Sequence, residues 1–126
     1  MQIRKLSVVL VNHNPLLREG LSVLVRAQPD MELHAAVATG EEGIQLYRER
    51  RPDVILIDLD LPHGAGIPTI VQIREADPGA VVLGLATDEW DESLKKAAMR
   101  AGARGCLAKS RLTAELVSKI REYLSS

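Results

Sequence analysis

Aromatic residues are scarce in this 126-residue sequence, which has two tyrosines, one tryptophan and no phenylalanine. Hydrophobic residues still make up 46% of the chain and charged residues 26%, which is typical of a folded globular protein. The core must therefore consist of Val, Leu, Ile and Ala, which pack well between helices and a parallel sheet. A chain of this length can bury such a core unaided, so we expect one domain over residues 1–126, either free-standing or excised from a longer protein.

Several other features are missing, and each absence excludes a class of protein. Cys106 is the only cysteine, so an intramolecular disulfide and a two-cysteine zinc motif are excluded. No apolar run approaches the roughly 20 residues that span a bilayer, and the N-terminus lacks a signal-peptide cleavage pattern. Net charge is −1 without a basic cluster, which argues against direct binding of nucleic acid. We expect a cytoplasmic protein that binds neither membranes nor nucleic acid.

Short apolar runs alternate along the chain with longer amphipathic segments, as in a series of βαβ units. The predicted fold is a flavodoxin-like α/β three-layer sandwich with five parallel strands in the order 2-1-3-4-5 and right-handed crossovers. The predicted strands are residues 6–11, 31–38, 53–58, 80–86 and 104–109. The predicted helices are residues 15–28, 41–50, 69–77, 91–102 and 113–124, with a loop at 59–68 and with Asp88 and Thr113 as caps of the last two helices.

Three chemically distinct side chains end neighbouring strands of this predicted sheet. Asp58 ends the third strand, Thr87 follows the fourth and Lys109 ends the fifth. The carboxyl ends of parallel strands form the usual ligand crevice of such folds. An aspartate beside a hydroxyl donor and a cation can become an acyl phosphate, whose oxygens Thr87 and Lys109 would bind. Taken singly, Asp58 is equally a turn residue, Thr87 a helix-start residue and Lys109 a surface charge or a structural partner of Asp58.

Three longer stretches of the chain carry a resemblance to a known family. They are NPLLREGL (14–21), RPDVILIDLDLP (51–62) and AGARGCLAKS (101–110). The chain resembles the receiver domain of two-component response regulators, especially the subfamily with a C-terminal LuxR-type helix-turn-helix output domain. This resemblance implies that Asp58 is the phospho-acceptor, Thr87 the switch hydroxyl and Lys109 the phosphoryl contact. It also implies that the backbone carbonyl of Asp60 is a metal ligand.

The sequence departs from this family at the end of the first strand, where an acidic pair should hold magnesium. Asn12 and His13 stand in its place. Mg²⁺ prefers oxygen ligands, whereas an imidazole better suits zinc, nickel or copper. Each missing charge is worth on the order of 1–4 kcal/mol, so we expect weak or absent Mg²⁺ binding at Asn12, His13, Asp58 and Asp60. A turn of the Asp60 side chain into the pocket would supply a substitute carboxylate, although an exposed Asp60 is the simpler interpretation.

Four other residues have less specific interpretations. Cys106 replaces the aromatic residue that the family usually has three positions before the lysine, and we interpret it as a core residue. Trp90 is equally compatible with a partner contact and with helix-start packing. We interpret His34 and His63 as surface or loop residues, because their spacing from His13 fits no metal motif.

These features favour an atypical receiver that signals with little or no phosphorylation of Asp58. One alternative is a conventional receiver, phosphorylated by a histidine kinase and dimerising through the face of helix 91–102, strand 104–109 and helix 113–124. A pure protein-interaction or dimerisation module is another, and His13 is also a candidate pH-sensitive group. An enzyme is disfavoured, because the chain lacks a G-x-S-x-G elbow, a glycine-rich phosphate loop and aromatic residues to stack on a flavin.

Overall fold

The computed structural model describes residues 4–87 and 91–125, in which five parallel strands alternate with five α-helices. The strands are β1 (Leu6–Val11), β2 (Met31–Val37), β3 (Val54–Asp58), β4 (Val82–Ala86) and β5 (Gly105–Ala108). The helices are α1 (Pro15–Arg26), α2 (Gly40–Arg50), α3 (Gly66–Ala76), α4 (Glu92–Ala101) and α5 (Leu112–Ser125). The strand order is β2-β1-β3-β4-β5, which confirms the predicted flavodoxin-like topology.

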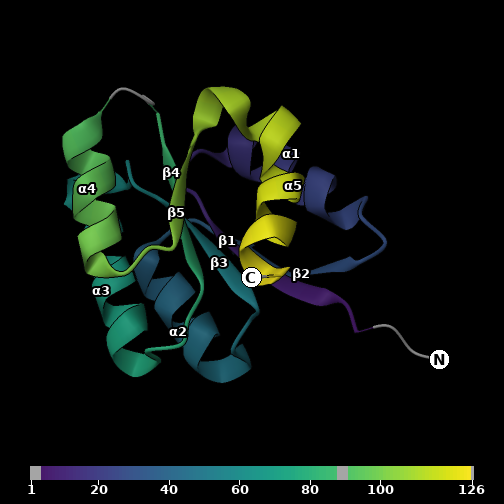
Figure 1. Ribbon diagram of the computed structural model, residues 1–126, viewed down its shortest axis with the longest axis horizontal. Coiled ribbons are helices and arrows are strands. Elements are labelled where there is room, and N and C mark those ends of the chain that lie inside the picture. The colour runs from purple at the N-terminus through teal and green to yellow at the C-terminus, as the bar shows by residue number, and fades with distance from the viewer. Residues whose placement is uncertain (1–3, 88–90, 126) are drawn as a thin grey trace.

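The sheet lies between two layers of helices, with α1 and α5 on one face and α2, α3 and α4 on the other (Figure 1). Successive residues of a strand point to opposite faces, so each strand contributes to both layers of the core. Val8 and Leu10 pack towards α1 and α5, whereas Val9 and Val11 pack towards α2 and α3. Burial on both faces explains why the strands are continuous apolar runs in the sequence.

Helix α3 begins at Gly66, inside the segment 59–68 that the sequence predicted as a loop. Pro68 caused this error, but it occupies the first turn of α3, where a missing N–H costs no helical hydrogen bond. Gly66 is closely packed against the end of β3. A Cβ atom there would lie 2.9 Å from both the Asp58 carbonyl oxygen and the Leu59 Cα. Only glycine lets the start of α3 pack directly onto the end of β3.

Two helices are capped by side chains that the sequence analysis did not name as caps. Asn14 caps α1 by accepting the backbone N–H groups of Leu16 and Leu17. Helix α4 is capped by Asp91, whose carboxylate accepts the Leu94 N–H at 3.0 Å. The predicted cap, Asp88, lies outside the described residues.

The other helix and strand ends differ by small amounts. Helix α5 begins at Leu112, so Thr113 lies inside its first turn rather than at the cap. Helix α1 ends at Arg26, and β4 begins at Val82, each two residues short of the predicted bound. These shifts leave the strand ends that form the crevice in place.

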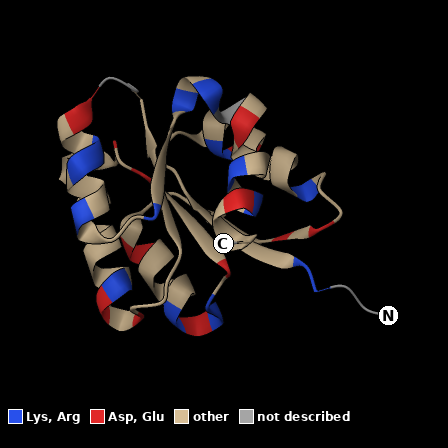
Figure 2. Ribbon diagram, viewed as in Figure 1, with Lys and Arg blue, Asp and Glu red and all other residues tan. Residues whose placement is uncertain are grey.

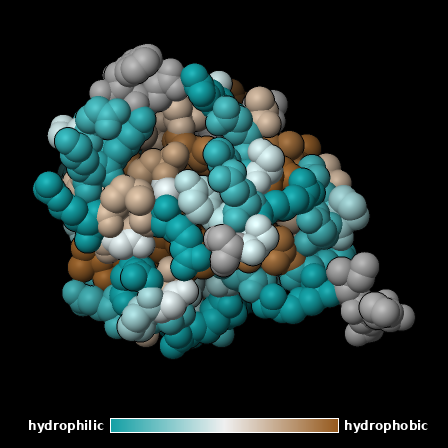
Figure 3. All heavy atoms as spheres, viewed as in Figure 1, coloured by the Kyte–Doolittle hydropathy of each residue, from teal (hydrophilic) through white to brown (hydrophobic). Residues whose placement is uncertain are grey.

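The surface carries both signs of charge. Basic and acidic residues are both spread over the helices (Figure 2), and on the face drawn in Figure 3 hydrophobic patches are separated by hydrophilic ones. Within the described residues, no helix combines the length and apolarity that crossing a bilayer requires.

Candidate functional site

The three predicted site residues lie together at the carboxyl edge of the sheet. Asp58 ends β3 with only 1% of its surface exposed, and Lys109 directly follows β5. The Lys109 Nζ lies 2.8 Å from the Asp58 Oδ1, and the Asp60 backbone N–H donates to the same oxygen at 2.9 Å. A buried carboxylate is strongly disfavoured without partners, so the Lys109 ammonium and the Asp60 peptide are what make a charged Asp58 tolerable here.

The side chain of Asp60 is directed towards the crevice rather than away from it. Its Oδ2 accepts hydrogen bonds from the Thr87 backbone N–H, at 2.9 Å, and from the Thr87 hydroxyl. The same oxygen lies 3.4 Å from the Lys109 Nζ, while 39% of the side chain stays exposed. Thr87 therefore hydrogen-bonds to Asp60, and Lys109 is shared between Asp58 and Asp60.

Opposing effects act on the pKa of the Asp60 carboxyl. Partial burial works to raise it, but the two hydrogen bonds from Thr87 and the charge of Lys109 outweigh burial. The net effect holds the pKa of Asp60 below its ordinary value, so the group is an anion at neutral pH.

Asn12 and His13 diverge at the end of β1. Asn12 is fully buried, and its Oδ1 accepts the Asn14 backbone N–H at 2.9 Å. Its Nδ2 has no hydrogen-bond partner among the described residues. His13 is exposed, and Arg18 donates to the Asn12 carbonyl oxygen at 2.8 Å. Within residues 4–87 and 91–125, no three His, Cys, Asp or Glu side chains gather so that they could hold a metal ion.

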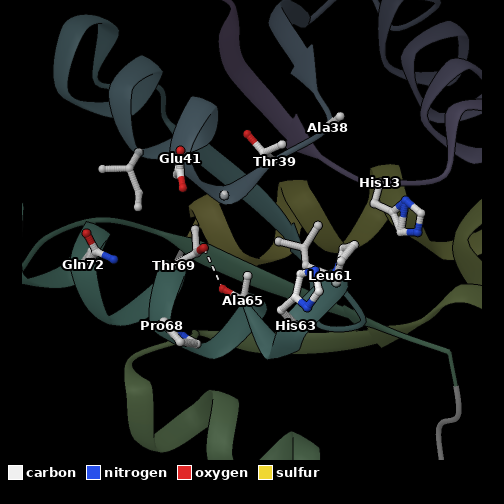
Figure 4. A pocket seen from close by; sticks show the side chains of 13 residues that line it. His13, Ala38, Thr39, Glu41, Leu61, His63, Ala65, Pro68, Thr69 and Gln72 are labelled. Carbon is white, nitrogen blue, oxygen red and sulfur yellow. Dashed lines mark hydrogen bonds between the residues drawn. The ribbon is translucent and has the colours of Figure 1, made fainter.

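A cavity of about 500 Å³ lies beside this edge, between the segment that follows β2 and the start of α3 (Figure 4). His13 and His63 line one part of it, and Glu41 and Gln72 line another (Figure 4). His63 is an exposed loop residue, as predicted, with a left-handed backbone (φ 60°). No motif in the sequence indicated this cavity, because its walls come from three separate segments.

The remaining candidates have structural surroundings. Cys106 is half-buried, packs against the core between the sheet and α2–α4, and pairs in register with Gly84. Burial raises the pKa of its thiol, which disfavours the reactive thiolate. His34 is half-buried in β2, so its assignment to a surface or loop position was wrong. Trp90 lies outside the described residues.

Sequence reasoning missed two contacts at the site. The first is the bond from Thr87 to the Asp60 side chain, for which the only signal was the Asp-Leu-Asp spacing of residues 58–60. The second is the hydrogen bond from the Arg18 guanidinium to the Asn12 carbonyl oxygen, which no sequence pattern indicated.

Comparisons with known proteins identify the family of this chain. The family model for the response regulator receiver domain matches residues 8–121. The transcriptional regulatory proteins YxjL and LiaR of Bacillus subtilis are 36% and 37% identical over 117 and 116 residues, covering 93% and 90% of this chain. The matches cover 53% and 54% of those two proteins, so the chain spans about half the length of these curated relatives.

A solved structure gives the same result. The crystal structure of a LuxR-family two-component response regulator from Aurantimonas sp. SI85-9A1 is 34% identical and superposes with a TM-score of 0.89, covering 96% of this chain and 86% of that one. The matched family model, the relatives and the fold lead to one conclusion: this chain belongs to the response regulator receiver domain family.

Proposed function

We propose that this domain is an atypical receiver, which passes a signal through protein contacts while Asp58 is phosphorylated weakly or not at all. In this proposal Asp58, Thr87 and Lys109 are the inherited phospho-acceptor, switch hydroxyl and phosphoryl contact. The observation that carries the proposal is the burial and hydrogen bonding of the Asn12 side chain. This buried neutral amide stands where a magnesium-binding acid is expected, and its oxygen already accepts the Asn14 N–H.

The donor set around Asp58 fits a magnesium ion poorly. Receiver domains use Mg²⁺ for phosphorylation, and Mg²⁺ needs several oxygen ligands in an octahedral shell. Here the unpartnered atom of Asn12 is an N–H donor, His13 offers an exposed ring nitrogen, and the Asp58 Oδ1 already binds Lys109. Loss of two charges, each worth on the order of 1–4 kcal/mol, corresponds to a drop of at least about 30-fold in affinity.

The conventional alternative needs a substitute metal ligand, for which Asp60 is the candidate. Its Oδ2 already accepts two hydrogen bonds from Thr87 and lies 3.4 Å from Lys109. A metal ion would therefore have to break those contacts, which favours the atypical receiver. The enzyme alternative gains no support from YxjL and LiaR, both of which are named transcriptional regulatory proteins.

Partners of the domain follow from its family. Receiver domains interact with histidine kinases or phosphotransfer proteins, and they dimerise. For this chain we propose a kinase or another signalling protein, dimerisation through the α4–β5–α5 face, a cytoplasmic location and no direct contact with nucleic acid. A DNA-binding output domain in the whole protein is part of the same proposal, since the matched relatives are about twice as long.

Exposed apolar side chains point to a second contact surface on α1. Leu16 is 82% exposed and Val23 is 58% exposed, whereas Met99 on α4 is 47% exposed. Large apolar side chains gathered on one helix face are typical of protein contacts. The test compares α1 with the α4–β5–α5 face as the surface for self-association, measured by light scattering. For a dimer formed through α1, the double variant Leu16→Ser/Val23→Ser weakens self-association more than Met99→Ser does. An equal or larger effect of Met99→Ser would support the α4–β5–α5 face instead.

The direct test of the proposal is a Mg²⁺ titration followed by nuclear magnetic resonance (NMR). The wild type is compared with the double variant Asn12→Asp/His13→Asp, which restores both acids. We expect saturable binding at millimolar Mg²⁺ or tighter in the double variant, and none in the wild type over the same range. Saturable wild-type binding as tight as that of the double variant, or at micromolar Mg²⁺, would contradict the proposal.

A further inference from the structure

The contacts of Asp60 have a consequence for how the crevice is regulated. One oxygen of Asp60, Oδ2, accepts the Thr87 N–H and the Thr87 hydroxyl, and it lies 3.4 Å from the Lys109 ammonium. These two residues are the ones that the proposed function assigns to the oxygens of a phosphoryl group. An anionic oxygen supplied by the chain itself thus already engages both.

The position of Asp60 is fixed by its own backbone. Its peptide N–H donates to the Asp58 Oδ1 at 2.9 Å, which folds residues 58–60 into a tight turn. The same Asp58 Oδ1 binds Lys109 at 2.8 Å, so Asp58, Lys109 and Asp60 form one connected network. This network brings the Asp60 carboxylate to Thr87, 27 residues further along the chain, rather than leaving it in solvent.

We infer that Asp60 is an internal stand-in for a phosphoryl oxygen, which holds Thr87 and Lys109 in their ligand-engaged arrangement without phosphorylation. Carboxylate and phosphoryl oxygens accept the same charge-assisted hydrogen bonds. The Thr87 hydroxyl has a single proton, so it cannot bind an added phosphoryl group while it donates to Asp60. The inference rests on the proposed function for the roles of Thr87 and Lys109, but the contact itself does not.

Two consequences follow from this arrangement. The end of β4 stays bound to the crevice in the unmodified protein, so the state of Thr87 does not depend on a phosphate donor. Any group added to Asp58 must first displace Asp60, and the two negative charges would then repel each other. Asp60 therefore both replaces the ligand and opposes its entry.

The test uses NMR on the whole 126-residue chain and measures hydrogen exchange of the Thr87 amide. Samples are the wild type, Asp60→Asn, Asp60→Ala and the control Glu41→Gln, an exposed acid on α2. Loss of a hydrogen bond to a charged group predicts roughly ten- to a hundredfold faster exchange in Asp60→Ala, a smaller increase in Asp60→Asn and none in the control. Unchanged exchange in both Asp60 variants would overturn the inference.

A second measurement separates a phosphoryl stand-in from a purely structural contact. Inorganic phosphate is titrated into the wild type and Asp60→Ala while the Thr87 and Lys109 signals are followed. We expect saturable shifts of both signals in Asp60→Ala and none in the wild type, because removal of the carboxylate frees the two donors. If phosphate binds neither protein, or both equally, Asp60 does not occupy a phosphoryl position. Asp60→Asn, which keeps the side-chain shape, serves the same comparison if Asp60→Ala folds poorly.

The inference and the proposed function fail in different ways. Phosphorylation of Asp58 by acetyl phosphate that is as complete in the wild type as in Asn12→Asp/His13→Asp would contradict the proposed function. The Thr87 contact, measured without any phosphate donor, would stand in that case. Conversely, if the hydrogen exchange of the Thr87 amide does not depend on Asp60, the inferred role of Asp60 is wrong. The proposed loss of the magnesium site would not be affected by that result.

Discussion

Replacement of Lys109 by methionine isolates the contribution of the buried ion pair. Methionine keeps an apolar stem of similar length, so the main change is removal of the ammonium. The Asp58 side chain is 2% exposed and that of Lys109 is 18% exposed, so the variant leaves a buried carboxylate without its cation. Breaking such a pair typically costs about 3–5 kcal/mol, and the partial exposure of Lys109 places our expectation at about 3 kcal/mol. For a domain of this size that loss lowers the melting temperature by about 12 °C.

The assay is urea unfolding of four proteins in a double-mutant cycle: wild type, Lys109→Met, Asp58→Asn and the combination. Because Asp58→Asn removes the stranded charge, the combined variant should recover at least about 1 kcal/mol relative to Lys109→Met alone. Lys119→Met, which breaks the exposed pair with Glu122, is the control and should leave the free energy of unfolding unchanged within error. The reasoning is refuted if Lys109→Met costs less than about 1 kcal/mol, as for a surface pair, or if the combined variant is no more stable than Lys109→Met.

Four further substitutions are measured by the same urea assay. Gly66→Ala should destabilise by about 1–3 kcal/mol, because the added methyl meets rigid backbone of β3. A Gly66→Ala variant as stable as the wild type would refute the close packing. Gly20→Ala is the matched control: its new methyl meets nothing within 4 Å, so it should stabilise α1 by about 0.5–1 kcal/mol. Asn14→Ala should cost about 1 kcal/mol through the lost cap of α1, and no loss would show that solvent replaces the cap. Burial works to raise the pKa of Asp53, but its bonds from Ser7 and Arg4 hold the pKa below its ordinary value. The contribution of Asp53 to stability is therefore present above about pH 4 and is lost as pH falls through the pKa of the folded state. Asp53→Asn should then lose less stability on acidification than the wild type does. Equal losses in the two proteins would contradict this reasoning.

The fold could be predicted from the sequence because local pattern and global topology agree. The runs 8–11 and 54–57 are apolar on both faces, which is typical of the inner strands of a covered parallel sheet. The start of α3 could not be predicted, because Pro68 and Gly66 are loop signals unless the tight approach to β3 is known. At this point the packing of Gly66 onto β3 outweighs the local preference of Gly66 and Pro68 for a loop.

The candidate site was predictable in position but not in its internal contacts. Asp58, Thr87 and Lys109 meet because strand ends share one edge of the sheet, which follows from topology alone. The direction of the Asp60 side chain depends on a turn onto Asp58 and on a residue 27 positions away, and no short-range pattern reports that. Asn12 was predicted as a weak ligand by residue type, whereas its engaged oxygen and unpartnered N–H depend on the path of the loop after β1.

The most direct test of the central claim is the intact mass of the protein after incubation with acetyl phosphate and Mg²⁺. The wild type is measured beside Asp58→Ala and beside Asn12→Asp/His13→Asp. The account predicts little or no phosphoryl adduct on the wild type, none on Asp58→Ala, and a larger adduct on the variant with restored acids. A wild-type mass gain of one phosphoryl group that is as complete as in the restored variant and disappears in Asp58→Ala would contradict the account, because it would show that Asp58 accepts phosphate efficiently without the acidic pair.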